Sequence, residues 1–403
     1  MELLLDMLSV PVKFFKDYGG PFVLVLSLLV FVHEWGHYIV ARMCGVKVVS
    51  FSIGFGKELF GWTDKRGCRW KFSLVPLGGY VQMFGDTDPA SAQHDDTVKN
   101  AADDAPRPMT AEERKVAFFA QPVGRRAAIV IAGPAINYIF AIFILAGLYV
   151  FQGQPYIPPV AAGIAEGYPA EQAGMRPDDL IVAMNDTEIV SFNDLRKFMA
   201  VNLDQPLKMT IKHSTAPGEW NSAPKTVDIQ PRLEYETDRF GFRHATGRLG
   251  IVSPKGAMEM REHNIASAFW YATLETVNIT ADTLKALGQM VLGIRSTDEL
   301  GGILRIGAYA GDFAQKGLVA FITFAALLSV NLGFINLLPI PMLDGGHLLM
   351  YAMEKIRGRP LSDMVQEYML RVGLLFLLFI MVFATWNDLV QLKLVDYVKS
   401  LIS

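Results

Sequence analysis

The chain contains a short motif whose residues are suited to binding a metal, His33-Glu34-Trp35-Gly36-His37. On a helix, two histidines four positions apart lie one turn apart on the same face, with the glutamate beside them. Such a pair of imidazoles can bind zinc, and the carboxylate can then act as a general base. The motif alone also occurs by chance in helices that bind no metal. The surrounding residues are therefore needed to judge whether it indicates a metal site.

The surroundings of the motif are those of a membrane helix. Residues 22–43 are almost entirely apolar outside the motif, and a bilayer crossing needs about 20 such residues. Ionisable side chains at membrane depth are costly, so they are functional by default. Gly36 would let another helix approach closely. The motif therefore predicts a zinc-dependent hydrolytic site within a membrane.

The composition supports a membrane protein. The chain has 403 residues, of which 51% are hydrophobic, and a mean hydropathy of +0.28. A soluble enzyme of this length is rarely so apolar. The net charge of −3 gives no sign of a nucleic-acid partner. Cys44 and Cys68 lack metal-ligand spacing and are expected to be reduced thiols.

Hydropathy predicts an α-helical polytopic membrane protein. After an N-terminal lead over 1–21, we expect four transmembrane helices, at 22–43, 124–151, 317–350 and 370–392. Lysine and arginine near the span ends set the orientation. They are concentrated in the loops after the first and third spans: Arg42, Lys47, Arg114, Lys115, Arg125, Arg126, Lys355, Arg357, Arg359 and Arg371. Those two loops are therefore expected in the cytoplasm, and the termini and 152–316 on the other side.

Residues 44–84 alternate apolar and polar positions between glycines, which predicts β-hairpins on the cytoplasmic side. Two interpretations remain open. The hairpins dip into the lipid, or they form a small soluble sheet with one buried face. Residues 85–123, rich in Asp, Ala and Pro at their start, are expected to form a flexible cytoplasmic loop.

Residues 155–233 have the character of a separate α/β domain. Their pattern predicts a short helix, a strand, a hairpin, a second helix and two further strands, and it resembles a PDZ domain, with Asp178 where glycine is usual. An unrelated α/β domain is the alternative. Residues 234–316 are expected to be an amphipathic connecting region, in which 265–294 forms a helix lying on the membrane surface.

A catalytic zinc normally has three protein ligands, so a third ligand is needed besides the two histidines. The third span ends in a segment that contains Pro339 and Pro341, which cannot continue a helix, and then Asp344. Irregular backbone at membrane depth is tolerated where it is buried in protein or lines a watery cavity. The first and third spans both run inward, so His33, His37 and Asp344 are expected at the same depth, near the cytoplasmic side.

Two other side chains compete with Asp344 for this role. Glu58 follows His37 at a spacing known from soluble zinc peptidases, but it lies in a glycine-rich β segment instead of on a second helix. His347 lies three residues after Asp344, and its simpler interpretation is packing or capping of the next helix. The remaining histidines, His94, His213, His244 and His263, fall in polar loops or in the outer domain.

Taken together, HEWGH, Gly133-Pro134-Ala135-Ile136-Asn137, the segment from Asn336 to Gly346 and the inserted domain resemble the site-2 protease family, specifically its bacterial regulator-of-sigma protease group. The resemblance covers nearly the whole chain. It implies an intramembrane zinc metalloendopeptidase of the bacterial inner membrane. Its implied substrates are single-pass membrane proteins, pre-trimmed by another protease, such as a membrane-bound anti-sigma factor or signal-peptide remnants.

The resemblance also implies roles for individual residues. His33, His37 and Asp344 would bind Zn2+, Glu34 would be catalytic, and Asn336 would hold substrate. The hairpin region would enter the bilayer and pair with substrate. Two departures stand out: there is room for one PDZ domain where better-known members have two, and Gly301-Gly302 is followed by Ile303 where proline is frequent.

Two non-proteolytic functions compete with this interpretation. A membrane scaffold that uses only its PDZ-like domain would not need an intact HExxH motif with Asp344. A transporter that binds the metal as cargo would be expected to show repeated halves and a second polar broken helix, which the sequence lacks.

Overall fold

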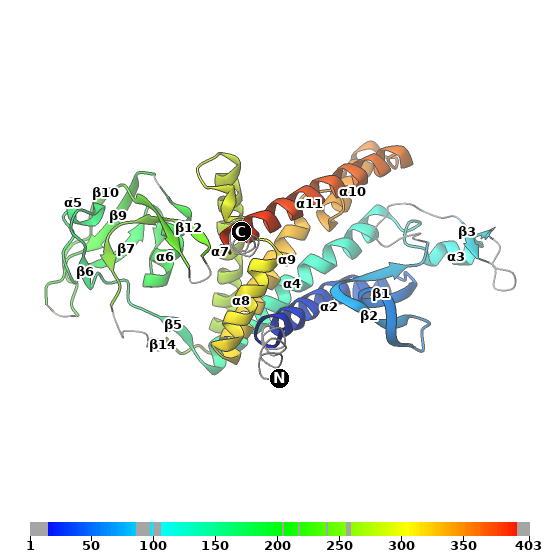
Figure 1. Cartoon of the computed structure of the whole chain (residues 1–403), viewed down its shortest axis with the longest axis horizontal. Helices are drawn as coiled ribbons and strands as arrows, with labels where there is room; N and C mark the ends of the chain where they lie inside the picture. Colours follow the sequence, from blue (N-terminus) through cyan, green and yellow to red (C-terminus); the bar gives the residue numbers. More distant parts are fainter. Residues whose placement is uncertain are drawn as a thin grey trace, which may run out of the picture. The chain divides into compact units, whose positions relative to one another are not determined.

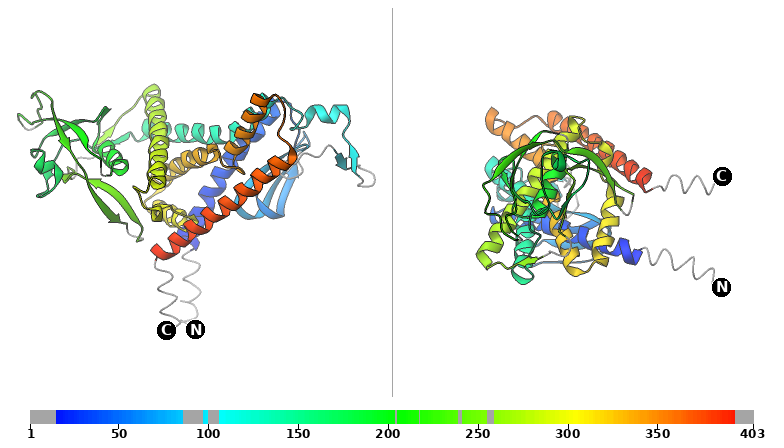
Figure 2. Two further views of the ribbon diagram at one scale, coloured as in Figure 1. Left: turned by 90° about the horizontal axis from the view of Figure 1, so that it is seen from above. Right: turned by 90° about the vertical axis from the view of Figure 1, so that its left-hand side faces the viewer.

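The structure is a computed structural model, and it describes residues 15–85, 97–99, 106–203, 205–216, 218–238, 241–254 and 259–392. The chain divides into two compact units. The first contains residues 1–145 and 302–385, and the second contains 146–301 and 386–403. Figures 1 and 2 show the elements of each unit.

Four helices in the described part of the chain are long and apolar enough to cross a membrane, as predicted. They cover Phe15–Met43, Val123–Phe151, Leu318–Leu337 and Met364–Gln391. The first combines a π-helical turn, Phe15–Gly19, with α2, Gly20–Met43. The others are α4 (Val123–Phe151), α9 (Leu318–Leu337) and α11 (Asp363–Gln391). Of the N-terminal lead predicted over 1–21, residues 1–14 lie outside the described residues, and residues 15–21 belong to the first of these helices.

The first unit is built on close contacts of α2, α4 and α9. A Cβ atom at Gly36 of α2 would lie 2.4 Å from the carbonyl oxygen of Ala132 in α4, so only glycine allows this approach. The hydroxyl of Ser329 in α9 donates to the Asn137 carbonyl in α4 at 2.9 Å. A further helix, α8 (Ile303–Gln315), packs on α2 and α9 through an apolar core. These contacts fix the first and third spans against the second.

The third predicted span is divided by a break in the helix. Helix α9 ends at Leu337, and α10 occupies Asp344–Arg357, so the single element expected over 317–350 is two helices. The two prolines prevent α9 from continuing. Met342 adopts a positive φ of 82°, and a Cβ at Gly345 would lie 2.2 Å from the Leu338 carbonyl. This tight turn brings the start of α10 back against the end of α9.

The hairpin region consists of two long bent strands, β1 (Val48–Thr63) and β2 (Arg69–Met83). Residues 50–53 pair with 79–82 on one side and with 69–72 on the other, and 60–63 pair with 69–72. The strands therefore fold into four adjacent segments. Gly54 and Gly78, with φ of 91° and 138°, lie at the bends. Because this pairing is between distant residues, the sequence pattern predicts strands here without their arrangement.

The hairpin region lies along α2 (Figures 1 and 2). The Tyr38 hydroxyl donates to Asp64 at 3.4 Å in the turn between the strands. Further along, a Cβ at Gly79 would lie 2.9 Å from Val30, and the Ser27 hydroxyl donates to the Pro76 carbonyl at 3.4 Å. Contacts therefore extend from Tyr38 to Ser27, which is about 16 Å of helix at 1.5 Å per residue.

Of the region predicted as a flexible loop over 85–123, the described part contains ordered elements. Strand β3 (Thr97–Lys99) pairs with β4 (Pro106–Pro108), and helix α3 covers Ala111–Val116. Thr110 and Glu113 form a reciprocal capping box at the start of α3. Residues 86–96 and 100–105 lie outside the described residues.

The second unit contains a four-stranded sheet in the order β10-β9-β7-β8. Its elements follow the predicted sequence: α5 (Pro169–Gln172), β7 (Leu180–Met184), β8 (Thr187–Glu188), α6 (Phe192–Val201), β9 (Leu207–Lys212) and β10 (Lys225–Ile229). Asp178 has a φ of 66°, the left-handed conformation in which glycine is usual and Asp is tolerated. The departure noted in the sequence is therefore sterically accommodated.

The amphipathic region expected over 234–316 begins with strands. Strands β11 (Arg232–Thr237) and β12 (Arg243–Arg248) form a ribbon, whereas β13 (Ile251–Val252) and β14 (Glu259–Arg261) pair with β6 (Gly163–Ile164) and β5 (Gln154–Tyr156). The strands at the end of this region therefore pair with strands from the start of the second unit. Helix α7 (Ile265–Val291) follows, with exposed apolar side chains that include Trp270, Val277 and Leu284. Its location on a membrane surface stays a prediction.

Candidate metal centre

Three side chains predicted as ligands converge in the first unit. His33 and His37 lie on α2, one turn apart, and Asp344 is the first residue of α10. The two Nε2 atoms are 3.2 Å apart, and Asp344 Oδ2 lies 3.1 Å from His33 Nε2 and 3.5 Å from His37 Nε2. Both imidazoles are buried. Among the described residues, these three form the group of His, Cys, Asp and Glu side chains that could hold a metal ion.

The hydrogen bond on the far side of His37 determines which of its nitrogens is available. Its Nδ1 lies 2.9 Å from the Ile129 carbonyl oxygen in α4. A carbonyl can only accept a hydrogen bond, so Nδ1 carries the proton. In the neutral ring, Nε2 then has its lone pair directed at His33 and Asp344. This is the arrangement usual for metal-bound histidine.

The spacing of the three atoms fits a zinc ion. Ligand atoms about 2.0–2.1 Å from a tetrahedral zinc are about 3.3 Å from one another. The three separations, 3.2, 3.1 and 3.5 Å, match this edge length. Asp344 Oδ2 is moreover buried without a hydrogen-bond partner among the described residues. Lone pairs packed this closely repel one another unless a cation or a proton lies among them. The arrangement of His33, His37 and Asp344 therefore suits a bound zinc ion.

Asn137 of α4 supports His33 from behind. Its side-chain amide lies 3.1 Å from His33 Nδ1, with the amide nitrogen on the histidine side, while Oδ1 is buried with no partner among the described residues. The two ends of an amide have nearly the same shape, and their assignment follows from the hydrogen-bond network. Rotation of the amide would let Oδ1 accept a hydrogen bond from the Nδ1–H group of His33, which leaves the lone pair of His33 Nε2 free to bind metal.

Glycine and glutamate complete the surroundings of the three ligands. A Cβ at Gly133 in α4 would lie 2.2 Å from His37 Nε2, so only glycine leaves room for the imidazole. Glu34 is half-buried, interacts electrostatically with all three ligands and accepts a hydrogen bond from the Val81 backbone in β2. The candidate general base therefore lies between the metal ligands and the hairpin region.

The rival ligands lie elsewhere or make other contacts. Glu58 pairs with Arg69 at 2.5 Å on the hairpin, and His347 is not among the three grouped ligands. Cys44 and Cys68 are free, and burial raises the pKa of Cys68 to about 11, which disfavours a thiolate ligand. Asn336 is half-buried in the last turn of α9, and its substrate role stays a prediction.

Sequence reasoning did not identify Ile129, Gly133 and Asn137 as parts of the site. Gly133 and Asn137 fall in the GPAIN segment, for which the sequence predicts no chemical role. The available signal was their spacing of four, which places them on the same face of a helix. A polar amide on an apolar helix needs a partner, and here the partner is His33.

Known metalloproteases are similar to this chain over most of its length. The sequence profile described as peptidase family M50 matches residues 21–380. A candidate zinc metalloprotease of Agrobacterium fabrum is 41% identical over 381 residues, covering 94% of this chain and 97% of that protein. One from Rhizobium meliloti is 37% identical, covering 96% and 99%. The metalloprotease MmpA of Caulobacter vibrioides is 34% identical, covering 94% and 96%.

Among solved structures, the PDZ domain of an SdrC-like protein from Listeria monocytogenes covers 26% of this chain and 90% of that chain. The sequence identity is 18% and the TM-score is 0.17, so this likeness carries no argument.

The metal ligands can be tested by substitution. We expect Asp344→Asn to lower zinc affinity by more than about 100-fold, because a direct ligand should matter more than a supporting residue. Glu58→Gln and His347→Ala, as matched controls, should keep their zinc. Metal content of the purified proteins and competition with a chromophoric chelator measure this. Zinc that follows Glu58 instead would contradict the geometry.

Asn137 can be tested by comparing two substitutions of similar size. We expect Asn137→Leu to lower zinc affinity about 10- to 100-fold, the usual cost of losing a partner behind a metal-bound histidine. Asn137→Asp should keep the affinity, since its carboxylate can accept from His33 Nδ1. Chelator competition and thermal unfolding without metal separate binding from stability. If Asp and Leu weaken zinc equally, Asn137 is only a packing residue.

Proposed function

The chain belongs to peptidase family M50 and is a zinc metalloprotease, and from this premise we propose that it hydrolyses peptide bonds in or near membrane-spanning segments of other proteins. The observation that carries the proposal is the position of the ligands. His33 and His37 lie within a helix long enough to span a bilayer, and Asp344 follows directly after the break that ends another such helix. The attacking water and the scissile peptide bond would therefore come together at the metal ligands, within the depth of the membrane.

The chain's own residues divide the chemistry between them. His33, His37 and Asp344 would hold the zinc ion, which when bound supplies Lewis-acid polarisation of the scissile carbonyl. Glu34 would take a proton from the attacking water and transfer it to the leaving amine. Its hydrogen bond with the Val81 backbone orients the carboxylate beside the ligands.

The hairpin region offers a means of presenting the substrate. Residues 79–83 pair with β1 on one side, and no described strand pairs with their other side. This edge passes Glu34, since a Cβ at Gly79 would lie 3.4 Å from the Glu34 side chain. A substrate helix that unwinds exposes backbone donors and acceptors, which strand addition satisfies. We infer that the unwound segment pairs here, and that Asn336 binds its backbone.

The contacts along α2 support insertion of the hairpin region into the bilayer. Its distal bends reach Ser27, well inside the first span. They expose large parts of several apolar side chains, including Phe55, Leu59, Leu74 and Val75. A soluble sheet would bury such a patch. The lipid-inserted interpretation is therefore the one we propose.

The proposed orientation places the basic loops in the cytoplasm. Arg126, at the start of α4, pairs with Glu354 in α10 at 2.6 Å, and both side chains are largely buried. This contact supports a location of the two basic loops on the same side of the membrane, and their charge favours the cytoplasmic side. In a bacterial inner membrane, the termini and the second unit would then be extracytoplasmic.

The proposed substrates are single-pass membrane proteins already shortened by another protease, such as an anti-sigma factor or a signal-peptide remnant. With the PDZ-like domain outside and the ligands near the inner side, this domain cannot supply catalytic groups. It would instead exclude substrates that still carry bulky external domains.

The role of Glu34 is tested by Glu34→Gln. The substitution keeps the size of the side chain and leaves the zinc ligands intact. We therefore expect unchanged zinc content and a loss of about 100- to 10,000-fold in cleavage of a reporter with one membrane span. Chelator-treated wild-type protein serves as the inactive control. Near-normal turnover by the variant would remove Glu34 from the mechanism.

The gating role is tested by deletion at a point that the fold suggests. Residues 157–258 lie between Tyr156 and Glu259, which pair across β5 and β14. A short Gly-Ser link between these two residues would remove the enclosed domain. We expect cleavage of a short pre-trimmed substrate to persist and cleavage of the untrimmed substrate to increase.

Zinc content confirms that the deleted protein retains its catalytic unit. If a zinc-loaded deletion variant cleaves neither substrate, the domain captures substrate directly and the gating proposal is wrong.

A further inference from the structure

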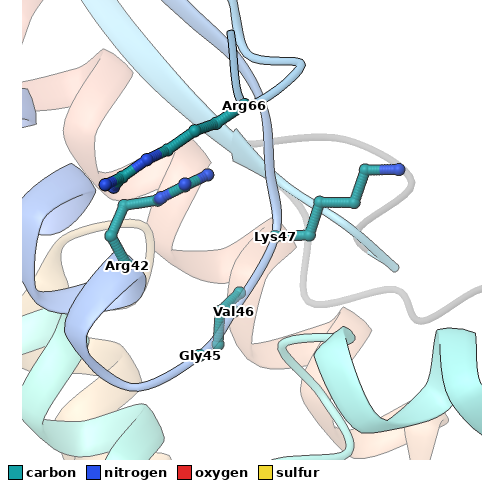
Figure 3. Close-up of a pocket in the computed structure, with 5 residues that line it drawn as sticks. All are labelled: Arg42, Gly45, Val46, Lys47 and Arg66. Carbon is teal, nitrogen blue, oxygen red and sulfur yellow. The ribbon is translucent and has the colours of Figure 1, made fainter.

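A cluster of basic side chains lies in the first unit, away from the metal ligands. Arg42, from the last turn of α2, and Lys47 and Arg66, from the hairpin region, line one pocket together with Gly45 and Val46. The side chain of Arg66 extends towards Arg42, whereas Lys47 points to the opposite side (Figure 3). The pocket lining therefore contains three cations and no anion.

The turn that presents Arg66 is built around Asp64. Its carboxylate accepts hydrogen bonds from the backbone N–H groups of Arg66 at 2.8 Å and Cys68 at 2.9 Å. It also accepts from Trp70 and Tyr38. Burial opposes ionisation of Asp64, but these hydrogen bonds and the charge of Arg42 hold its pKa below the usual value. The single negative charge of Asp64 only partly compensates the three positive charges of the cluster.

The two guanidinium groups remain available for a ligand. Neither Arg42 nor Arg66 forms an ion pair with a carboxylate of the described residues. Lys47 contacts the ring of Phe84, 5.1 Å from its nitrogen, and so lies at the rim. Like charges brought together without a partner are unfavourable, and an anion placed between them removes this cost.

The level of the pocket suggests the source of the anion. Arg42 is the penultimate residue of the first candidate span, and its neighbour Met43 is 80% exposed. Trp62, at the end of β1 next to the Asp64 turn, is 49% exposed. Exposed tryptophan and arginine at the end of a membrane helix are typical of the lipid headgroup level.

We propose that Arg42 and Arg66 form a binding site for a phosphate group, contributed by the headgroup of an anionic phospholipid, with Lys47 at its rim. Guanidinium groups bind phosphate through paired N–H donors, which a single ammonium does not provide. A lipid bound here would join the end of α2 to the Asp64 turn. It would thereby hold the hairpin region against the helix that carries His33 and His37.

The test is a binding titration with the full-length, zinc-loaded protein in neutral detergent. Native mass spectrometry counts bound phosphatidylglycerol, with phosphatidylcholine as the lipid of no net charge. We expect preferential binding of phosphatidylglycerol, weakened about 5-fold by Arg42→Gln or Arg66→Gln and about 30-fold by both. Lys65→Gln is the matched control, because it removes a charge from the same exposed turn without altering the pocket lining.

Inorganic phosphate distinguishes the two sources of the group. If millimolar phosphate displaces the lipid from the wild-type protein, the site binds phosphate without requiring the lipid. If it does not, the lipid is the ligand. Either result supports a phosphate-binding site, provided that the variant with both Arg42→Gln and Arg66→Gln has lost lipid binding. Equal weakening by Lys65→Gln, or unchanged lipid binding by a zinc-loaded double variant, would overturn the proposal.

Discussion

The first unit depends on one constraint, which is that three buried lone pairs must converge within hydrogen-bonding distance. The Nε2 atoms of His33 and His37 and the Oδ2 atom of Asp344 are 3.1 to 3.5 Å apart. Desolvated groups of this kind are unstable together without a cation. Bound zinc would therefore serve both the chemistry and the packing, because the residues that would hold it come from α2 and from the start of α10.

Helix α4 provides the frame on which this convergence rests. Gly36 and Gly133 permit the backbones and the His37 ring to approach, while the Ile129 carbonyl and Asn137 hold the two imidazoles from behind. Ser329 fixes α9 to the same turn of α4. The hairpin region then covers the other side of α2 and brings Val81 to Glu34. The interface between α2 and α4 thus positions the metal ligands, and the hairpin region positions Glu34 and the strand edge proposed to bind substrate.

Much of this arrangement follows from the sequence, because the informative features are local. Histidines four apart in an apolar helix, and prolines before Asp344, predict the ligands and the break. The role of Asn137 was not predictable in the same way, since its partner His33 lies 104 positions away. The four-segment arrangement of the hairpin region also depends on contacts between residues distant in the sequence. The bounds predicted for the third span, 317–350, differ from the structure, in which that helix ends at Leu337, whereas four helices long and apolar enough to cross a membrane lie near the predicted spans.

X-ray absorption spectroscopy of the zinc-loaded protein tests the central claim most directly. The account predicts nitrogen and oxygen neighbours at about 2.0–2.1 Å and outer-shell scattering from two imidazoles. The scattering should be unchanged when Cys44 and Cys68 are both replaced by serine. A sulfur neighbour at about 2.3 Å, or the absence of imidazole scattering, would show that zinc is bound elsewhere and would contradict the account.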